Sequence, residues 1–399
     1  MTPIMQNTDT DTTTLAREQL LAGLRGVSDA YVGREPTVRA LARAALTGEH
    51  VLLLGPPGTA KSALTRDFVG LFKAEMFALL LGSFTPPEEI FGPLDIGALQ
   101  QGRMSRLTAG YLPTASFSFL DEIFKANGGL LNSCLTALNE RKLRLDGQEM
   151  DIPLISCVGA SNELPNEDDN LGALYDRFAA RIWISDSTAL ELREILDDRP
   201  TPPSGVITLA QLAQCQQEAA QVVVPGEMKD LMIKLRQTLA ESNIKASARR
   251  WRALLKVLKA EAWLDGEPEV NEDHFGALMF SLGDDPEKDY ATVREACDKL
   301  GSPLLGDVED LRETLTEAMT TRGPVPQAGT DPSTSATWMS KAGDYAVTLE
   351  RIRRNCVELT MDYAEAKPSR ATRSLAALTA KVAEETQNNL AAMATRYTI

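Results

Sequence analysis

The amino-acid sequence predicts an α/β protein in which a parallel β-sheet is covered by helices and is followed by two helical segments. Three observations lead to this prediction. Short apolar runs of strand length alternate with stretches of helical periodicity over residues 15–200, a pattern typical of parallel strands buried on both faces. A loop rich in Gly and Pro, with a lysine and a serine at its end, follows the first of these runs. After Pro200 the composition shifts to residues that favour helices.

Composition limits the class of protein. The chain has 399 residues, which is enough for two or three domains. Its apolar fraction of 43% and charged fraction of 24% are ordinary for a globular protein with a sizeable core. The net charge of −15 argues against a nucleic-acid or anionic-membrane surface as the main partner. No apolar run approaches the length of a transmembrane helix.

The N-terminal stretch and the cysteines point to a cellular location. Residues 1–14 are polar, rich in Thr and Asp, and lack the apolar segment of a secretory signal, so we expect a disordered tail. The five cysteines are scattered without a CxxC pair. We expect them to be small core residues in a reducing compartment, which makes the cytoplasm the predicted location. Because the chain has two histidines, a His-based metal site is not expected.

Hydrophobic periodicity gives the order of elements in the first half of the chain. Helices are expected at residues 15–30, 36–46, 62–71 and 128–139, and strands at residues 51–54, 76–81, 116–120, 154–160 and 181–184. An Asp-Gly pair between residues 143–145 and 148–152 predicts a hairpin with a tight turn. Residues 82–110 are dense in Gly and Pro and long for a connection, so we interpret them as a functional loop or an inserted element.

The second half of the chain is helical by the same criterion. Four helices are expected at residues 209–220, 226–241, 246–264 and 271–282, and another at 308–322, before a flexible linker at 323–337. From Trp338 to Tyr363 apolar residues alternate in steps of four and three, and a weaker stripe runs from Ala371 to Met393. We interpret these stripes as an antiparallel helical hairpin that packs on the 308–322 helix. A plain bundle core and a docking surface fit the pattern about equally well.

The loop GPPGTAKS at residues 55–62 lies between a predicted strand and a predicted helix, which is the setting of a phosphate-binding P-loop. In this pattern Lys61 contacts the β- and γ-phosphates of a nucleotide, and the Ser62 hydroxyl binds Mg²⁺. Ala60 stands where the general pattern has its last glycine, and we expect its methyl group to require a negative φ. An ordinary Gly/Pro turn between a strand and a helix is the alternative interpretation.

Two more predicted strands end in polar residues. The strand at 116–120 is followed by Asp121 and Glu122, and the strand at 154–160 is followed by Asn162. We expect Asp121 to hold Mg²⁺ and Glu122 to polarise the attacking water, while Asn162 could orient that water from the opposite side. Taken singly, these residues would more often mark a solvated strand end or a turn. Following a phosphate-binding loop, they predict an ATPase site.

Taken together, the motifs resemble the MoxR group of AAA+ ATPases and, within it, the RavA-like branch. The resembling segments lie at residues 49–62, 85–94, 110–113, 119–126, 138–141, 160–165 and 174–178. The resemblance implies a P-loop AAA+ core with a five-stranded parallel sheet, an all-α lid and a C-terminal helical domain. Ala60 matches the family pattern and therefore does not count against the site.

The resemblance also implies roles for the polar residues and the use of ATP/ADP with Mg²⁺. Lys61 is implied as the Walker A lysine, and Asn162 as sensor 1. Asp121 and Glu122 are implied as the Walker B pair. The implied nucleotide-binding residues are Tyr31, Val32, Gly55, Pro56, Pro57, Gly58, Thr59, Ala60, Lys61 and Ser62, with adenine near residues 31–33.

Arginines are implied at two further places. An arginine finger that reaches the γ-phosphate of the neighbouring subunit is implied at Arg177, with Arg181 as a second candidate. A sensor 2 is implied at Arg249, with Arg250 less favoured. From residue chemistry alone, these arginines would more often be ordinary surface charges.

The resemblance implies a hexameric ring that acts on a protein client together with an adaptor that carries a von Willebrand factor A (VWA) domain. RavA has a β-rich domain inserted in its terminal helical domain, and here the linker at 323–337 occupies that place. The lysine decarboxylase partner of RavA is therefore not implied. The implied domains are a tail at 1–14, an AAA+ domain at 15–200, a lid at 201–286 and a helical domain at 287–399. Residues 82–110 match the helix-2 insert and residues 141–152 the pore-side hairpin, both expected to face the centre of the ring.

Two other functions remain open at this point. The helix-2-insert clade contains DNA helicase subunits, so a nucleic-acid-stimulated AAA+ motor is the alternative function, although the acidic net charge makes nucleic acid an unlikely partner. A nucleotide-gated scaffold with negligible turnover is a third interpretation. The set of Asp121, Glu122, Asn162 and Arg177 argues against it.

Overall fold

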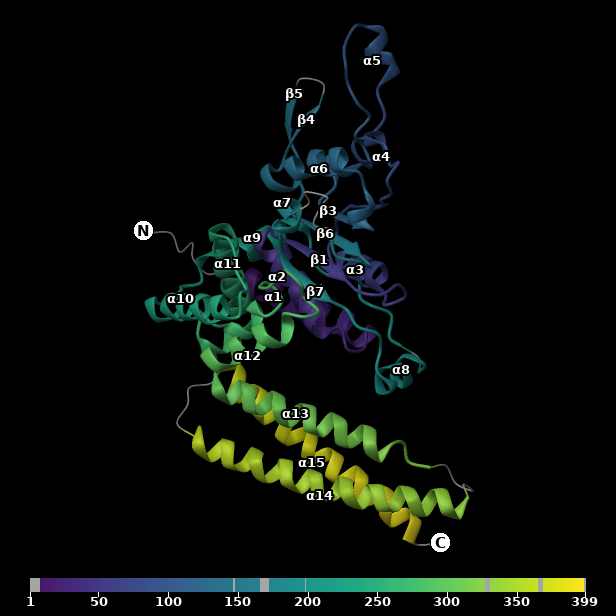
Figure 1. Ribbon diagram of the computed structural model, residues 1–399, viewed down its shortest axis with the longest axis vertical. Helices are drawn as coiled ribbons and strands as arrows, with labels where there is room; N and C mark the ends of the chain where they lie inside the picture. Colours follow the sequence, from purple (N-terminus) through teal and green to yellow (C-terminus); the bar gives the residue numbers. More distant parts are fainter. Residues whose placement is uncertain are drawn as a thin grey trace. The chain divides into compact units, whose positions relative to one another are not determined.

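The computed structural model describes residues 8–145, 148–165, 172–197, 199–326, 331–364 and 369–397 of the chain (Figure 1). It divides into two compact units, Met1–Arg294 and Glu295–Ile399. The first unit holds a β-sheet with its helices and an all-α lid, and the second consists of helices, so the predicted fold class is confirmed. Within the described residues, no helix combines the length and apolar character that a membrane crossing requires.

Five parallel strands form the sheet of the first unit, in the order β2-β3-β6-β1-β7. Their bounds are His50–Leu54 (β1), Met76–Leu80 (β2), Phe117–Asp121 (β3), Ser156–Ser161 (β6) and Phe178–Trp183 (β7). All residues of β1 are buried, as expected for a strand with a neighbour on each side and helices on both faces. The predicted strands are thus confirmed, with small shifts at their ends.

Side-chain alternation places the apolar residues of β1 on two faces of the sheet. Leu52 and Leu54 belong to a buried cluster that includes Leu131 of α6 (Gly128–Glu140). Helices α2 (Glu35–Thr47) and α3 (Lys61–Gly70) also contact the strands. Strand β6 packs closely at Gly159, where a Cβ would lie 3.0 Å from the Phe178 ring.

Residues 82–110 form an inserted element, as predicted. It contains the short helices α4 (Pro87–Phe91) and α5 (Ile96–Gln100), and an isolated bridge pairs Leu94 with Arg106. Figure 1 shows α5 at the end of this element that lies away from the sheet. The short 3₁₀ turns η1 (Leu112–Thr114) and η2 (Ile123–Lys125) lie before and after β3.

The predicted hairpin is confirmed in its strands, β4 (Lys142–Leu145) and β5 (Gln148–Asp151), which pair antiparallel. Its expected turn, residues 146–147, lies outside the described residues. The Arg141 guanidinium at its base donates to the carbonyls of Gly48 and Ile155, at 2.5 and 3.0 Å. Arg141 thereby ties the hairpin to the chain just before β1 and β6.

The buried His50 ring lies beside the Arg141 side chain. Its Nδ1 accepts a hydrogen bond from the Cys157 amide at 3.0 Å, and its Nε2 lies 2.9 Å from the Leu138 carbonyl. Because Nδ1 accepts from an amide it carries no proton, so the ring is neutral with its proton on Nε2, which also lies 2.9 Å from Arg141 Nη1. Burial, followed by the positive charge of Arg141, lowers the pKa of His50 to about 3.

Two expectations for the first unit are wrong. Helix α1 spans Thr8–Ala30, so residues 8–14 continue a helix instead of a disordered tail. Thr and Asp residues suit the start of a helix, which explains why a polar stretch can be helical. Residues 271–282 were expected to form an α-helix, but the structure has the 3₁₀ helix η4 (Glu272–Leu278). Gly276 weakens α-helical propensity there, and its carbonyl accepts the amide of Met279 at 3.4 Å.

The lid contains α9 (Leu209–Gln221), α10 (Gly226–Glu241) and α11 (Ala248–Asp265), as predicted. Thr208 and Ser247 cap α9 and α11 through their hydroxyls. Two further elements of this unit were not predicted: α7 (Gly172–Tyr175) and α8 (Ala189–Ile195), the latter beginning with a Thr188–Glu191 capping box.

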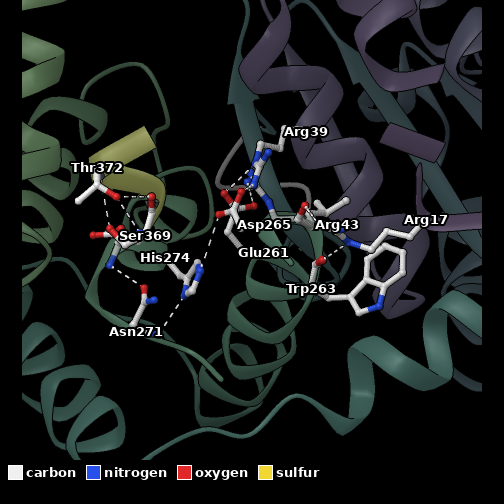
Figure 2. Close-up of polar contacts among 12 residues, drawn as sticks. Arg17, Arg39, Arg43, Glu261, Trp263, Asp265, Asn271, His274, Ser369 and Thr372 are labelled. Carbon is white, nitrogen blue, oxygen red and sulfur yellow. Dashed lines mark hydrogen bonds and ion pairs between the residues drawn. The ribbon is translucent and has the colours of Figure 1, made fainter. Parts of the chain in front are cut away.

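A buried ionic cluster joins the lid to α2. Arg39 lies 2.8 Å from Glu261 and 2.6 Å from Asp265, and Arg43 lies 2.9 Å from Glu261. Figure 2 shows both arginines directed at the Glu261 carboxylate, which is fully buried. Because removing one member would leave a buried charge unpaired, this cluster fixes α11 against α2.

The second unit consists of α13 (Pro303–Arg322), α14 (Pro332–Asp362) and α15 (Arg370–Tyr397), preceded by α12 (Tyr290–Leu300), which crosses the boundary between the units. The predicted apolar stripe of α14 is confirmed. The residues at its centre are buried, among them Ala342, Tyr345, Leu349, Ile352 and Cys356. Antiparallel pairing of α14 with α15 follows from two contacts, Asn389 Nδ2 to the Ala342 carbonyl at 2.9 Å and Tyr345 Oη to Glu385 at 2.9 Å.

One boundary in the second unit differs from the prediction. Helix α14 begins at Pro332, so residues 332–337, expected in the linker, are helical. Asp331 caps this helix, and a proline in the first turn suits a helix start. Residues 327–330 lie outside the described residues.

Candidate functional site

The strand order explains why the polar motifs meet. Strand β6 lies between β1 and β3, and all three are parallel. The phosphate-binding loop follows β1, Asn162 follows β6, and Asp121 and Glu122 stand at the end of β3. The carboxyl ends of parallel strands lie along one edge of a sheet, so Asn162 is placed between the loop and the two carboxylates.

The loop itself depends on close backbone packing. Gly55 has a φ of 137°, and a Cβ there would lie 2.1 Å from the Ile184 carbonyl oxygen. Only glycine therefore fits. The Thr59 hydroxyl donates to the Pro56 carbonyl at 3.0 Å, which closes the loop from within. The loop ends at the N-terminus of α3, where free amides and the helix dipole favour an anion.

The expectation that Ala60 has a negative φ is wrong. Its φ is 63° and its ψ is 19°, which is the left-handed region, and it directly precedes α3. The methyl group costs about 1 kcal/mol in that conformation, which a glycine would avoid. The chain tolerates this strain because the Ala60 carbonyl still accepts the first helical hydrogen bond, from Leu64 at 2.9 Å.

Lys61 lies at the centre of the site and is buried. Its ammonium donates to the Gly55 carbonyl at 2.6 Å, the Pro56 carbonyl at 2.8 Å and Asn162 Oδ1 at 3.1 Å. Burial lowers the pKa of Lys61, and the carboxylates of Asp121 and Glu122 counteract part of that effect. The cation thus lies between the loop carbonyls and Asn162, close to two carboxylates.

Ser62 and Asp121 bring a hydroxyl and a carboxylate oxygen into contact beside the phosphate-binding loop. The Ser62 hydroxyl donates to Asp121 Oδ2 at 3.3 Å, and Asp121 Oδ1 accepts the Glu122 amide at 3.0 Å. Mg²⁺ prefers oxygen ligands and is commonly held by one or two carboxylates together with substrate phosphates and water. A hydroxyl and a carboxylate in contact beside Lys61 fit that ion.

Glu122 is held by a hydrogen bond and an ion pair on one of its oxygens. Asn162 Nδ2 donates to Oε1 at 2.7 Å, and the Lys125 ammonium lies 3.3 Å from the same atom. The other oxygen, Oε2, is buried and accepts no hydrogen bond from the described residues. The Glu122 backbone has a φ of 51°, a strained conformation of the kind found at functional sites.

The expected adenine region is only partly supported. An open pocket of about 280 Å³ is lined by Gly33, Arg34, Pro36, Thr37, the end of β7, Phe280, Pro286, Glu287 and Tyr290. It lies between the residues after α1 and the lid, as expected. Tyr31 and Val32 are not among its lining residues, and the Tyr31 hydroxyl instead donates to Asp67 of α3 at 2.6 Å.

Arg177 and Arg249 lie close enough to influence one another. Burial, and then the charge of Arg249, lowers the pKa of Arg177. Arg249 is exposed, and the buried Arg177 Nε has no hydrogen-bond partner among the described residues. The contacts described for these two arginines do not include Lys61, Asp121 or Glu122.

The other two candidate arginines are engaged elsewhere. Arg181, the second finger candidate, is buried, donates to the Gly283 carbonyl at 2.8 Å and lies over the Tyr175 ring at 3.8 Å. Its guanidinium is therefore engaged within its own chain. Arg250 is buried and lies 2.8 Å from Asp176, whose other oxygen accepts the Ser247 hydroxyl at 3.1 Å.

Sequence reasoning missed two residues that touch this machinery. Lys125 contacts Glu122, and Asp176 holds Arg250 next to Arg177. Both lie within the quoted motifs, at residues 119–126 and 174–178. A lysine three residues after a carboxylate is a weak signal, since such spacing is common on any surface helix. The Asp176 contact spans distant parts of the chain and has no local signature.

Comparison with known proteins identifies related families and chains. Residues 18–201 match the family described as "MoxR domain in the MoxR-vWA-beta-propeller ternary systems", and residues 227–297 match an AAA lid domain. The uncharacterized protein MJ0812 of Methanocaldococcus jannaschii is 32% identical over 326 residues, which are 80% of this chain and 87% of that protein. The chaperone MoxR1 of Mycobacterium tuberculosis is 27% identical over 214 residues, 51% of this chain and 55% of its own length.

A solved structure gives the same fold. A proposed ATPase from Cytophaga hutchinsonii covers 73% of this chain and 96% of its own, with a TM-score of 0.61 and 16% sequence identity. At that identity the likeness concerns the fold alone.

Proposed function

This chain belongs to the MoxR family of AAA+ ATPases, and we propose that it hydrolyses ATP to drive the assembly or remodelling of a protein client. The observation that carries this proposal is the unbroken series of contacts from Lys61 through Asn162 to Glu122, with Ser62 and Asp121 alongside. Phosphoryl transfer depends mostly on positioning and charge neutralisation, and these residues supply both.

Each residue has a role in this proposal. Lys61 contacts the β- and γ-phosphates of ATP, and Ser62 and Asp121 hold Mg²⁺, which would neutralise charge that develops on the phosphates. Glu122 polarises the attacking water through its free Oε2, and Asn162 orients the reacting groups from the middle strand. The pocket beside Gly33 accepts the adenine.

We further propose that the active form is a ring, with six subunits as the expected number. Arg177 and Arg249 share one region of the surface and have no described contact with the site of their own chain. We assign them to the pocket of the adjacent subunit, Arg177 as the finger and Arg249 as sensor 2. An arginine supplied in trans is worth about 10³ to 10⁵ in rate, so activity per subunit should fall on dilution.

The partners proposed are a VWA-domain adaptor and a β-propeller protein. The matched family is described by its occurrence with these two kinds of protein, and the relative MoxR1 is named a chaperone. The RavA-like assignment and a cytoplasmic location remain predictions from the sequence.

The test is a steady-state ATPase assay with Mg²⁺, with the adaptor and with DNA or RNA added in separate arms. Turnover by the wild-type chain, with Lys61→Ala inactive, would support the proposal. Glu122→Gln should bind ATP and turn it over about 10²- to 10⁴-fold more slowly. A matched control is Glu75→Gln, an exposed glutamate just before β2. Stimulation by nucleic acid alone would favour the nucleic-acid motor instead.

A further inference from the structure

Lys125 is the residue near the carboxylates that the proposed mechanism leaves without a role. It is the last residue of η2, and its side chain is 49% exposed. Its ammonium lies 3.3 Å from Glu122 Oε1, the oxygen that also accepts from Asn162 at 2.7 Å. A hydrogen bond and an ion pair from different elements therefore hold one oxygen of the same carboxylate.

This arrangement decides which oxygen of Glu122 is available. The Asn162 hydrogen bond and the Lys125 ion pair both act on Oε1, so together they hold that oxygen in place. Because both contacts use Oε1, the buried Oε2 is left as the acceptor for a proton from water. General-base catalysis requires that acceptor within hydrogen-bond reach of the water, so its orientation affects rate directly.

Asn162 alone is a weak support for this orientation, because it is shared. Its Oδ1 accepts from Lys61 at 3.1 Å, and Lys61 also donates to two loop carbonyls. Phosphate oxygens would compete for the Lys61 ammonium, and Asn162 would then be free to shift. Lys125 has no such competing bond to the loop among the described contacts.

The main chain of Lys125 is itself held in place. Its carbonyl accepts the Ser83 hydroxyl at 3.3 Å, and Asn127, two residues later, caps α6. The side chain lines an open cleft of about 500 Å³ together with Gly82, Phe124, Asn127 and Glu163. The ammonium therefore contacts Glu122 from a backbone that is itself held by a hydrogen bond.

We propose that Lys125 is a positioning residue that orients Glu122 for attack by water once ATP has engaged Lys61. This inference rests on the proposed ATPase function. It assigns Lys125 an effect on the chemical step and none on nucleotide binding.

The experiment measures kcat and KM for ATP in Lys125→Met and Lys125→Arg, beside the wild-type chain. Lys256→Met is the matched control, because Lys256 lies 2.6 Å from Glu49 in an ion pair of similar exposure at the opposite end of β1. We expect Lys125→Met to lower kcat about tenfold, with KM changed less than about twofold. Lys125→Arg should recover most of the rate, and Lys256→Met should match the wild type.

A second measurement separates positioning from a general structural role. In the Glu122→Gln background, Lys125→Met should have no further effect on single-turnover hydrolysis, because the group on which it acts is already gone. An unchanged or higher kcat in Lys125→Met would overturn the inference, as would an equal loss in Lys256→Met or full additivity with Glu122→Gln. A wild-type chain without turnover would instead overturn the proposed function itself.

Discussion

The guanidinium of Arg250 lies 2.8 Å from the Asp176 carboxylate, although 74 residues separate them in the chain. The contact joins the first turn of α11 in the lid to the segment just before β7. Because Arg177 and Arg249 are the sequence neighbours of this pair, one ion pair sets the positions of both proposed trans-acting arginines.

Asp176→Asn should therefore weaken both stability and turnover. The Arg250 side chain is almost fully buried, whereas Asp176 is 31% exposed. The expected loss in the free energy of unfolding therefore lies between the values for buried and surface ion pairs, about 2 kcal/mol. Chemical denaturation measures it. Asp284→Asn is the control, since the 80% exposed Asp284 pairs with another buried arginine, Arg181, and should cost less than about 0.5 kcal/mol. Equal losses in the two variants would contradict the lid contact.

The trans role of Arg177 can be tested by mixing subunits. Arg177→Ala should lower kcat by about 10³- to 10⁵-fold, and Glu122→Gln should also be nearly inactive. Co-assembled rings of the two variants should recover activity, because an intact pocket of one can meet an intact finger of the other. Mixed rings without recovery would show that Arg177 does not act on a neighbouring pocket.

His50 should make stability fall in mild acid. Its pKa is about 3 in the folded chain and 6.5 in the unfolded chain, so the unfolded state binds the extra proton between these values. The stabilising contribution of neutral His50 is complete above about pH 6.5 and is lost as the pH falls toward 3. Over that range the free energy of unfolding falls by about 1.4 kcal/mol per pH unit.

Urea unfolding at several pH values checks this, with His50→Gln as the comparison. The carboxylates titrate in both proteins, so the difference between the two curves isolates His50. Parallel pH dependence in the wild type and the variant would contradict the assignment.

Ala60→Gly should stabilise the chain. The left-handed φ of 63° strains alanine, and glycine relieves that strain by about 0.5–1 kcal/mol after its larger unfolded-state entropy is counted. Asn243 also has a positive φ, of 61°, but asparagine tolerates this region, so Asn243→Gly is the control with a smaller gain. A loss of stability in Ala60→Gly would mean that the methyl group makes a compensating contact.

The sheet and its polar edge could be predicted because their signals are local. A strand such as β1 is apolar at every position after His50, and a motif such as Asp121-Glu122 directly follows such a run. The apolar stripe of α14 was predictable for the same reason, since helical spacing keeps its residues on one face of the helix.

The remaining features depend on contacts between distant parts of the chain. The pair Asp176–Arg250 has no local pattern, and the role of Lys125 depends on a 3.3 Å approach that spacing does not reveal. Ala60 was mispredicted because a residue's average preference for φ was applied to a loop whose closure dictates its backbone.

The close packing at Gly159 carries a consequence for inherited or engineered variation. The missing side chain lets β6 lie against the Phe178 ring, and β6 carries Asn162 at its end, three residues later. One added carbon atom at that position would lie 3.0 Å from the Phe178 ring and 3.2 Å from Leu52 Cδ1, so a side chain of β7 or β1 would have to shift by a few tenths of an ångström. A substitution at Gly159 would therefore act first on the packing of β6 against Phe178 and Leu52, while every proposed site residue stays unchanged.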